Sequence, residues 1–203
     1  MLLALVRHGE STWNAEWRMQ GQADPPLSDE GRAQALALRP LLDWLAPDVV
    51  VASDLARARE TAELVGHPDA LVDPRWREAD VGGWSGRLVR ELIAEDPDAY
   101  RGWLEHTHTP PGGEAWEATR ERVTGAARAL AAEGVRTALV VTHGGPVRAC
   151  CEVFTGLPRR HLVPVPTGSL TAMDLGGGPR LIVFGAAPGR AETAARNPAD
   201  AAA

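Results

Sequence analysis

The sequence predicts an α/β fold, a three-layer α/β/α sandwich around a mostly parallel sheet with a helical lid segment. Short apolar runs alternate with amphipathic stretches of helical period, which is the pattern of parallel strands joined by crossover helices. A chain of 203 residues, 44% hydrophobic and 24% charged, fits one globular domain. We assign residues 1–185 to that domain and predict a disordered tail over 186–203, where apolar periodicity is lost.

The first elements follow from an apolar run and a helix start signal. Residues 2–7 are continuously apolar up to a terminal arginine and predict a buried strand, and 9–21 predict a loop with a short helix. Ser28 is followed by two acidic residues, which is typical of an N-cap with acids in the first helical turn. The helix that begins there should extend through Leu45, with a kink or an interruption at Pro40.

The next elements repeat the strand and helix alternation. Residues 48–52 predict a second strand, and Ser53 is expected to cap a helix that ends near Val65. A third strand is predicted at 70–72. Residues 87–133 have a helical pattern, which the prolines and glycines of 109–113 interrupt, and we expect this break to belong to a lid over a site. The remaining predictions are a strand at 136–142, a helix at 145–154, and a β-hairpin of 167–174 and 180–184.

Composition limits the function classes. A net charge of -6 and a pI near 5.5 argue against binding to nucleic acid or to an anionic membrane. All 21 basic residues are arginines, which excludes Schiff-base lysine chemistry and leaves guanidinium groups to bind phosphate or carboxylate. The apolar start of the chain is too short for a signal peptide. The adjacent Cys150 and Cys151 match no disulfide framework, so we expect a cytoplasmic protein.

Two histidines follow two of the predicted strands. His8 comes directly after residues 2–7, and His143 directly after 136–142. The carboxyl ends of adjacent parallel strands open onto one crevice, so both imidazoles could share one pocket. Arg7 adds a permanent cation, and Gly9 removes a side chain where an anion could approach backbone amides. This combination suits an imidazole that attacks phosphorus while cations hold the phosphoryl oxygens.

Five ordered blocks of the chain resemble the histidine phosphatase superfamily, the phosphoglycerate-mutase-like proteins, and within it the phosphatase branch. The blocks cover residues 2 to about 148 and read LVRHGESTWN from Leu5, GQADPPL from Gly21, SDLARARETA from Ser53, READVGGWSG from Arg77 and VTHGG from Val141. The resemblance implies a phosphatase, a hydrolase that acts on small phosphomonoesters such as a sugar phosphate or a phosphoglycerate-type ester.

The resemblance also implies residue roles. His8 would be the nucleophile that becomes phosphohistidine, and Glu78 the acid that protonates the leaving oxygen and then activates water. Arg7, Arg57 and His143 would hold the phosphoryl group with positive charge. Further phosphate or substrate contacts are expected from Asn14, Gln20, Gly21 and Gly144. The scheme needs no metal and no cofactor, its partner is a small phosphate ester, and a homodimer is left open.

Several alternatives remain at this point. A 2,3-bisphosphoglycerate-dependent phosphoglycerate mutase shares the motifs, and a non-catalytic phosphate-binding module would share the fold. Arg57 could instead pair with Glu60 on one helix face. His106 and His108 alternate as metal-chelating histidines can, but no third ligand stands at a suitable spacing, so we place them in the lid.

Overall fold

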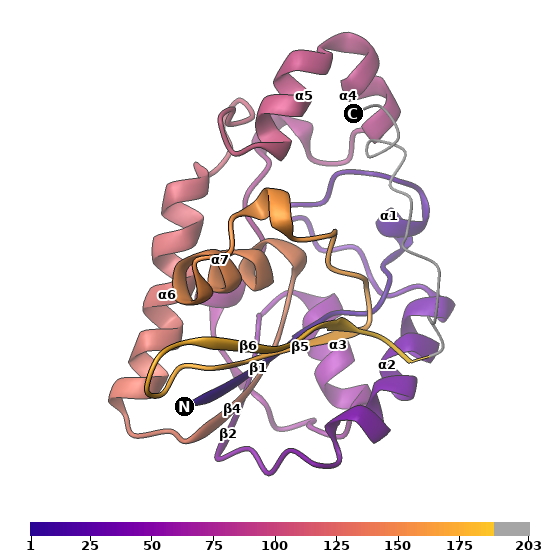
Figure 1. Cartoon of the computed structure of the whole chain (residues 1–203). Helices are drawn as coiled ribbons and strands as arrows, with labels where there is room; N and C mark the ends of the chain where they lie inside the picture. Colours follow the sequence, from indigo (N-terminus) through magenta and orange to yellow (C-terminus); the bar gives the residue numbers. More distant parts are fainter. Residues whose placement is uncertain (189–203) are drawn as a thin grey trace.

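A computed structural model describes residues 1–188 as one six-stranded sheet with helices on both faces (Figure 1). The strand order is β3-β2-β4-β1-β5-β6. The strands from β3 to β1 are parallel to one another, β5 is antiparallel to β1, and β6 is antiparallel to β5. The strands are β1 Leu2–Arg7, β2 Val49–Ala52, β3 Leu71–Val72, β4 Thr137–Thr142, β5 Ser169–Asp174 and β6 Arg180–Ala186. The α/β sandwich that the sequence predicts is therefore confirmed.

Seven α-helices and three short 3₁₀ helices complete the described part. The helices are α1 Thr12–Ala15, α2 Asp29–Leu42, α3 Ala56–Leu64, α4 Val89–Glu95, α5 Pro97–Leu104, α6 Trp116–Ala132 and α7 Gly144–Thr155. The 3₁₀ helices, which the sequence did not predict, are η1 Pro74–Trp76, η2 Gly82–Trp84 and η3 Arg159–His161. None of the helices in residues 1–188 has the length and apolar character needed to cross a bilayer.

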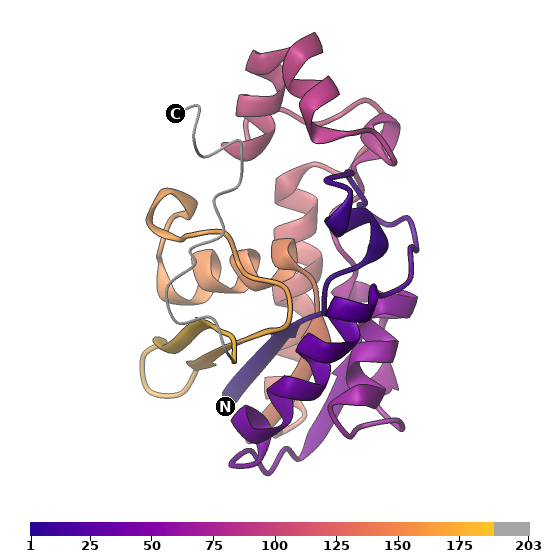
Figure 2. The same cartoon turned by 90° about the vertical axis from the view of Figure 1, so that its right-hand side faces the viewer.

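Alternation along β1 builds the two core layers. Leu3 and Leu5 face α6 and α7, whereas Ala4 and Val6 face α2 and α3, and all four side chains are fully buried. Successive side chains of a strand point to opposite faces, so this apolar run fills both layers at once. Figure 2 shows the helices on either side of the sheet.

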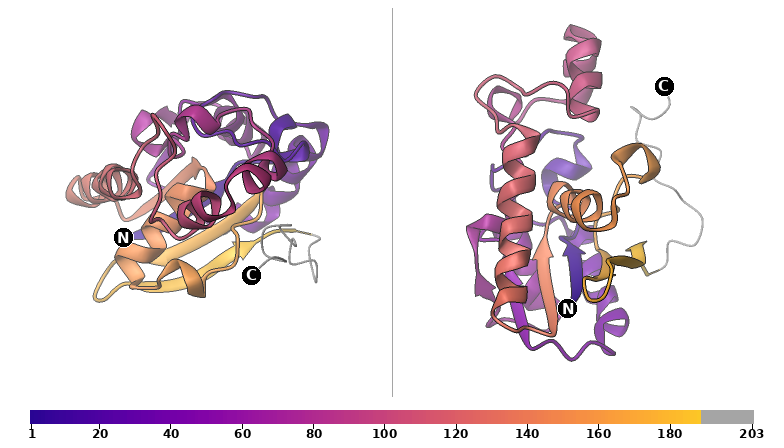
Figure 3. Two further views of the ribbon diagram at one scale, coloured as in Figure 1. Left: turned by 90° about the horizontal axis from the view of Figure 1, so that it is seen from above. Right: turned by 60° about the vertical axis from the view of Figure 1, so that its left-hand side comes forward.

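A third, smaller core belongs to the lid. Met19, Val81, Trp84, Leu92 and Tyr100 form it, and α4 and α5 contribute most of the side chains packed around it. Figures 1 and 3 show α4 and α5 beyond the end of the sheet where β1 and β4 finish. The lid segment therefore lies over the strand ends that carry the two histidines.

Two details of the predicted elements are wrong. Ser53 does not cap α3, because the N-cap residue is Leu55 and no side chain caps it; the Ser53 hydroxyl is instead a partner of a histidine ring described below. Nor does Pro40 interrupt α2, which includes this proline and ends at Leu42 rather than Leu45. Pro40 has no N–H to donate to the carbonyl of Leu36, so it costs one intrahelical hydrogen bond, and the helix ends two residues after it. Of the tail predicted over 186–203, Ala186 is instead the last residue of β6, and the part from 189 onward lies outside the described residues.

Candidate active site

A cavity of about 360 Å³ opens at the carboxyl ends of β1 and β4, below the lid. Eight of the nine residues predicted for the site line it, and these are Arg7, His8, Asn14, Gln20, Gly21, Arg57, Glu78 and Gly144. The ninth, His143, is fully buried next to His8, with 5.0 Å between the ring centroids. The sequence therefore named a set of residues that the fold does bring together.

The hydrogen bonds of His8 define its tautomer. Nδ1 lies 2.6 Å from the carbonyl oxygen of Gly9, and because a carbonyl can only accept, Nδ1 carries the proton. Nε2 then holds a lone pair, which accepts a hydrogen bond of 3.2 Å from Nε of Arg57. The ring is thus held with its unprotonated nitrogen beside the guanidinium group of Arg57.

The electrostatic surroundings keep both imidazoles neutral. Burial lowers the pKa of His8 well below its usual value, and the charges of Arg57 and Arg7 lower it further. Burial also lowers the pKa of His143, and the Arg57 guanidinium and the neighbouring His8 ring lower it further. These surroundings therefore favour a neutral His143 over the positively charged ring that we expected, because burial and the nearby guanidinium groups disfavour the imidazolium.

Arg57 is a buried cation fixed by backbone oxygens. Its side chain is 1% exposed, and its two terminal nitrogens donate to the carbonyls of Ala23 at 2.7 Å and Gly21 at 2.9 Å. Burial lowers the pKa of Arg57 to about 10, so the guanidinium is still charged at neutral pH. The alternative pairing with Glu60 is not observed, since that carboxylate instead binds Nε of Arg32 at 2.6 Å.

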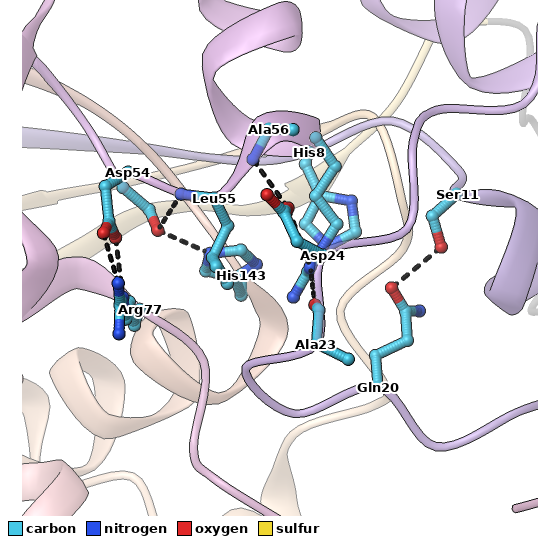
Figure 4. A network of polar contacts seen from close by, with 12 residues as sticks. His8, Ser11, Gln20, Ala23, Asp24, Asp54, Leu55, Ala56, Arg77 and His143 are labelled. Carbon is cyan, nitrogen blue, oxygen red and sulfur yellow. Dashed lines mark hydrogen bonds and ion pairs between the residues drawn. The ribbon is translucent and has the colours of Figure 1, made fainter. Parts of the chain in front are cut away.

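His143 stands at the N-terminus of α7, where its Nε2 lies 2.9 Å from the Ser53 hydroxyl. Its Nδ1 is buried and finds no hydrogen-bond partner among residues 1–188. A buried polar group without a partner costs free energy, which is a common sign of a ligand site. The same serine hydroxyl also accepts from the Leu55 amide at 3.4 Å, and both contacts are drawn in Figure 4.

Glu78 reaches the same place from the segment after η1. Both carboxyl oxygens accept from the amide of Gly145, each at 3.1 Å, and Oε1 also accepts from the Ala79 amide at 2.9 Å. The first turn of a helix offers free amides and positive partial charge, so α7 holds this acidic group in place. A Cβ on Gly145 would lie only 2.1 Å from Oε1, which explains glycine at this position.

Residues that the sequence reading did not select support the Glu78 segment. The neighbouring Arg77 forms a two-pronged ion pair with Asp54, drawn in Figure 4. Arg122 of α6 binds Glu114 and also donates to the backbone carbonyl of Arg77 at 3.0 Å. Asp54 and Arg77 stand inside the family blocks, but nothing in their spacing reveals that they pair across the fold.

The side chains of Asn14 and Gln20, which also line the cavity, both contact Ser11. The side-chain oxygen of Asn14 accepts from the Ser11 amide at 3.1 Å, and that of Gln20 lies 2.8 Å from the Ser11 hydroxyl. The side-chain oxygen of each amide is therefore engaged by Ser11. Ser11 and Asn14 form a capping box that fixes the start of α1.

Gly9 has a different role from the one expected. Its amide donates to the Thr61 hydroxyl at 3.1 Å and so does not face an anion, and a Cβ there would lie 2.2 Å from the carbonyl oxygen of Gly31. Glycine is required because the loop after β1 crosses the first turn of α2 at backbone contact.

Lid residues line the outer part of the cavity. His106 stacks on Trp116, with 3.8 Å between ring centroids, and its Nδ1 is 3.6 Å from a carboxyl oxygen of Glu152. His108 stacks instead on Trp84, at 5.7 Å. The placement of both histidines in the lid is therefore confirmed. In the described part of the chain, no three His, Cys, Asp or Glu side chains are grouped as metal ligands.

Arg148 is a further cavity residue that the sequence did not predict. It lines the cavity from α7, one helical turn after Gly144, and its buried Nε has no hydrogen-bond partner among residues 1–188. Only its spacing of four residues from Gly144 could have indicated that both lie on one helix face.

An open α/β sheet that presents a neutral imidazole, buried guanidinium groups and a helix-bound carboxyl group at one strand edge defines a class of phosphate-handling proteins. Residues 3–185 match the family model of the histidine phosphatase superfamily (branch 1), and the chain belongs to this family.

Named relatives agree with this assignment. The chain is 36% identical over 173 residues to a glucosyl-3-phosphoglycerate phosphatase of Mycobacterium tuberculosis, covering 77% of this chain and 76% of the relative. It is also 36% identical over 163 residues to a protein named "Probable phosphoglycerate mutase GpmB" of Cronobacter sakazakii, covering 76% and 74%. The structure resembles that of a mycobacterial glucosyl-3-phosphoglycerate phosphatase in complex with VO3, with a TM-score of 0.83, 33% identity and 91% and 98% of the chains covered.

Proposed function

We propose that this protein is a metal-independent phosphomonoesterase that acts through a phosphohistidine intermediate on His8. The state in which the structure holds His8 carries the proposal: the Gly9 carbonyl fixes the proton on Nδ1, burial favours the neutral ring, and Nε2 faces the Arg57 guanidinium. A neutral imidazole is the form that can attack phosphorus, and the adjacent cation can hold the phosphoryl oxygens during the attack.

In the first step Nε2 of His8 forms a bond to phosphorus while the bond from phosphorus to the ester oxygen breaks. Arg7 and Arg57 supply fixed positive charge for the phosphoryl oxygens. The buried Nδ1 of His143 can carry a further donor once an anion is bound, since negative charge raises the pKa of an adjacent imidazole. The side-chain amides of Asn14 and Gln20 are neutral donors for the same oxygens, because Ser11 engages their oxygens.

Glu78 is the acid and base of the cycle. It gives its proton to the departing ester oxygen, and in the second step the same carboxylate takes a proton from water as the water oxygen attacks phosphorus. That attack breaks the bond to His8, releases inorganic phosphate and restores the neutral ring. The Gly145 amide holds the carboxyl group against one wall of the cavity, which supports a single group serving both steps.

The substrate that fits is a small organic phosphomonoester, a sugar phosphate or a phosphoglycerate-type ester. Its phosphate would occupy the end with Arg7, His8 and Arg57, and its leaving group would extend beneath the lid. The names of the phosphatase relatives support this class. The thiols of Cys150 and Cys151 are free and buried in α7, which supports a reducing compartment, and we place the protein in the cytoplasm.

The test is phosphate release from p-nitrophenyl phosphate by the wild type and by His8→Ala. We expect turnover in the wild type and a loss of at least ~10³-fold in the variant, because the covalent step is removed. Thermal unfolding should show that the variant is folded. His161→Ala, which changes an exposed histidine, is the control and should keep full activity.

Three outcomes would contradict the proposal. Comparable activity in His8→Ala would exclude this residue as nucleophile. Conversion of 3-phosphoglycerate to 2-phosphoglycerate, stimulated by 2,3-bisphosphoglycerate and faster than hydrolysis, would show the mutase alternative. Binding of phosphate without turnover of any ester in a broad panel would indicate the non-catalytic module.

A further inference from the structure

Helix α1 ends in a Schellman motif with a tryptophan at the position that usually holds glycine. The Arg18 amide donates to the Trp13 carbonyl at 2.9 Å, and the Trp17 amide donates to the Asn14 carbonyl at 3.1 Å. These two bonds define the motif, and its C′ residue takes a left-handed conformation, here with φ of 57° at Trp17. A bulky side chain in that region is strained.

Other helices of the same chain end in the same motif with glycine. After α3, Gly66 takes φ of 104° and its amide donates to the Glu63 carbonyl. After α6, Gly134 takes φ of 81° and donates to the Ala131 carbonyl. Two helices of this chain therefore have the unstrained residue, glycine, at the C′ position, whereas α1 has a tryptophan there.

Strained helix ends coincide with the cavity. Among residues 1–188 the non-glycine positions with positive φ are Trp17 and His106, and both line the cavity. His106 is likewise the C′ residue of a Schellman motif, after α5, with φ of 64°. Gly66 and Gly134 are not among the residues that line it. Strained backbone conformations occur in proteins mainly at functional sites, where they hold a side chain in a particular position.

Two hydrogen bonds to one neighbouring segment fix the backbone around Trp17. The Trp17 carbonyl accepts from the Val89 amide at 2.9 Å, and the Met19 amide donates to the Arg87 carbonyl at 2.9 Å, so residues 17–19 are bound to the start of the lid. The side chain is nevertheless 48% exposed at the cavity. Exposure of a large aromatic surface adds to the cost of the strain, and a ligand that covers the indole would offset both.

We propose that Trp17 is a specificity-determining residue that stacks on the leaving group of the substrate, and that this leaving group contains a ring. The proposal rests on the phosphatase function above and names the class of ester. A flat indole face buries most area against another flat face, such as a sugar or aryl ring, and gains little from an open chain.

The test compares two phosphate esters of primary alcohols that differ in the ring: glucose 6-phosphate and glycerol 3-phosphate. Their inhibition constants are measured against p-nitrophenyl phosphate hydrolysis, so slow turnover of either does not matter. In Trp17→Gly we expect the constant for glucose 6-phosphate to rise roughly 3- to 10-fold, the range for an aromatic contact, and that for glycerol 3-phosphate to stay within about 2-fold. Thermal unfolding should shift upward by roughly 2–4 °C because glycine relieves the strain.

Two further variants separate stacking from structure. Trp17→Phe keeps an aromatic face and should keep most of the preference for the ring. Trp44→Ala removes another exposed tryptophan, 58% exposed and not part of the cavity wall, and should change neither constant.

The outcomes are decisive in both directions. Equal changes for the two esters, or no change, would overturn the role of Trp17 in selection, and a lower unfolding temperature in Trp17→Gly would overturn the strain argument. In these cases turnover that depends on His8 would leave the proposed function standing. Failure of the wild type to hydrolyse p-nitrophenyl phosphate or any other ester in a broad panel would instead reject the function, and the inference with it.

Discussion

At the scale of single residues, glycine and histidine owe their roles to what surrounds them. Gly145 is needed because the carboxyl group of Glu78 occupies the space of a Cβ, and it offers its amide to that same group. His8 owes its tautomer, with the proton on Nδ1, to one carbonyl, and burial favours its neutral form. Neither property is visible in the residue type.

Gly145→Ala should reduce kcat/KM for p-nitrophenyl phosphate by about 10- to 100-fold, which is the range for a displaced acid-base group. The added methyl would lie 2.1 Å from Oε1, and the flexible end of the Glu78 side chain has to move away. Stability should change little, because alanine suits the helix better than glycine. The measurements are steady-state kinetics and thermal unfolding.

Gly125→Ala is the matched control, since a Cβ on this α6 glycine has no atom within 4 Å. Its kcat/KM should equal that of the wild type. Unchanged kinetics in Gly145→Ala would mean that Glu78 does not act from the observed position.

At the scale of elements, the loop after β1 is fixed by its contact with α2. A Cβ on Gly31, in the first turn of that helix, would lie 1.9 Å from the backbone oxygen of Glu10, and one on Gly9 would meet Gly31 at 2.2 Å. The two glycines thus let the loop that carries His8 lie directly on the helix. The Thr61 hydroxyl binds the loop from α3.

Gly31→Ala should therefore lower the free energy of unfolding by at least ~2 kcal/mol, as overpacking against backbone does, because no side chain can move to make room. Urea unfolding measures the effect. Gly125→Ala, also a glycine within a helix, should raise the same free energy by about 0.5–1 kcal/mol. Equal effects of the two substitutions on the free energy of unfolding would show that the loop after β1 can move away from α2 at little cost.

At the scale of the whole molecule, folding buries two imidazoles beside two guanidinium groups. The folded-state pKa values of His8 and His143 lie well below 6.5, whereas in the unfolded chain both rings take up protons near that pH. Below pH 6.5 the unfolded state therefore binds more protons, and stability decreases as the pH falls.

Urea unfolding at pH 6.5 and 5.5 should differ by about 2 kcal/mol from these two groups together, with the lower stability at the lower pH. The double variant His8→Gln, His143→Gln should lose most of this dependence. His161→Gln, which changes an exposed histidine, should retain it. A pH-independent wild type between these values would show that the two rings are not held neutral.

Most of the fold and most of the site could be predicted from local patterns. The strands at 2–7, 136–142 and the hairpin that follows were found because buried strands are continuous apolar runs bounded by turn residues. Ser53 was misassigned because a serine before a helical pattern usually caps it, while here its hydroxyl contacts the ring of His143, which follows β4 and lies 90 residues later in the chain. A contact of that range leaves no local signal.

The sequence by itself determined the succession of strands and helices along the chain, the family, and the identity of the residues that gather at the strand ends. Hydrophobic period and motif order determine these features, and both are local properties of the chain. Only the tertiary structure decided which nitrogen of His8 keeps its proton, that both imidazoles are neutral, that Gly9 serves packing, and that Trp17 stands strained at the cavity. These properties depend on burial and on atoms brought within a few ångströms by folding.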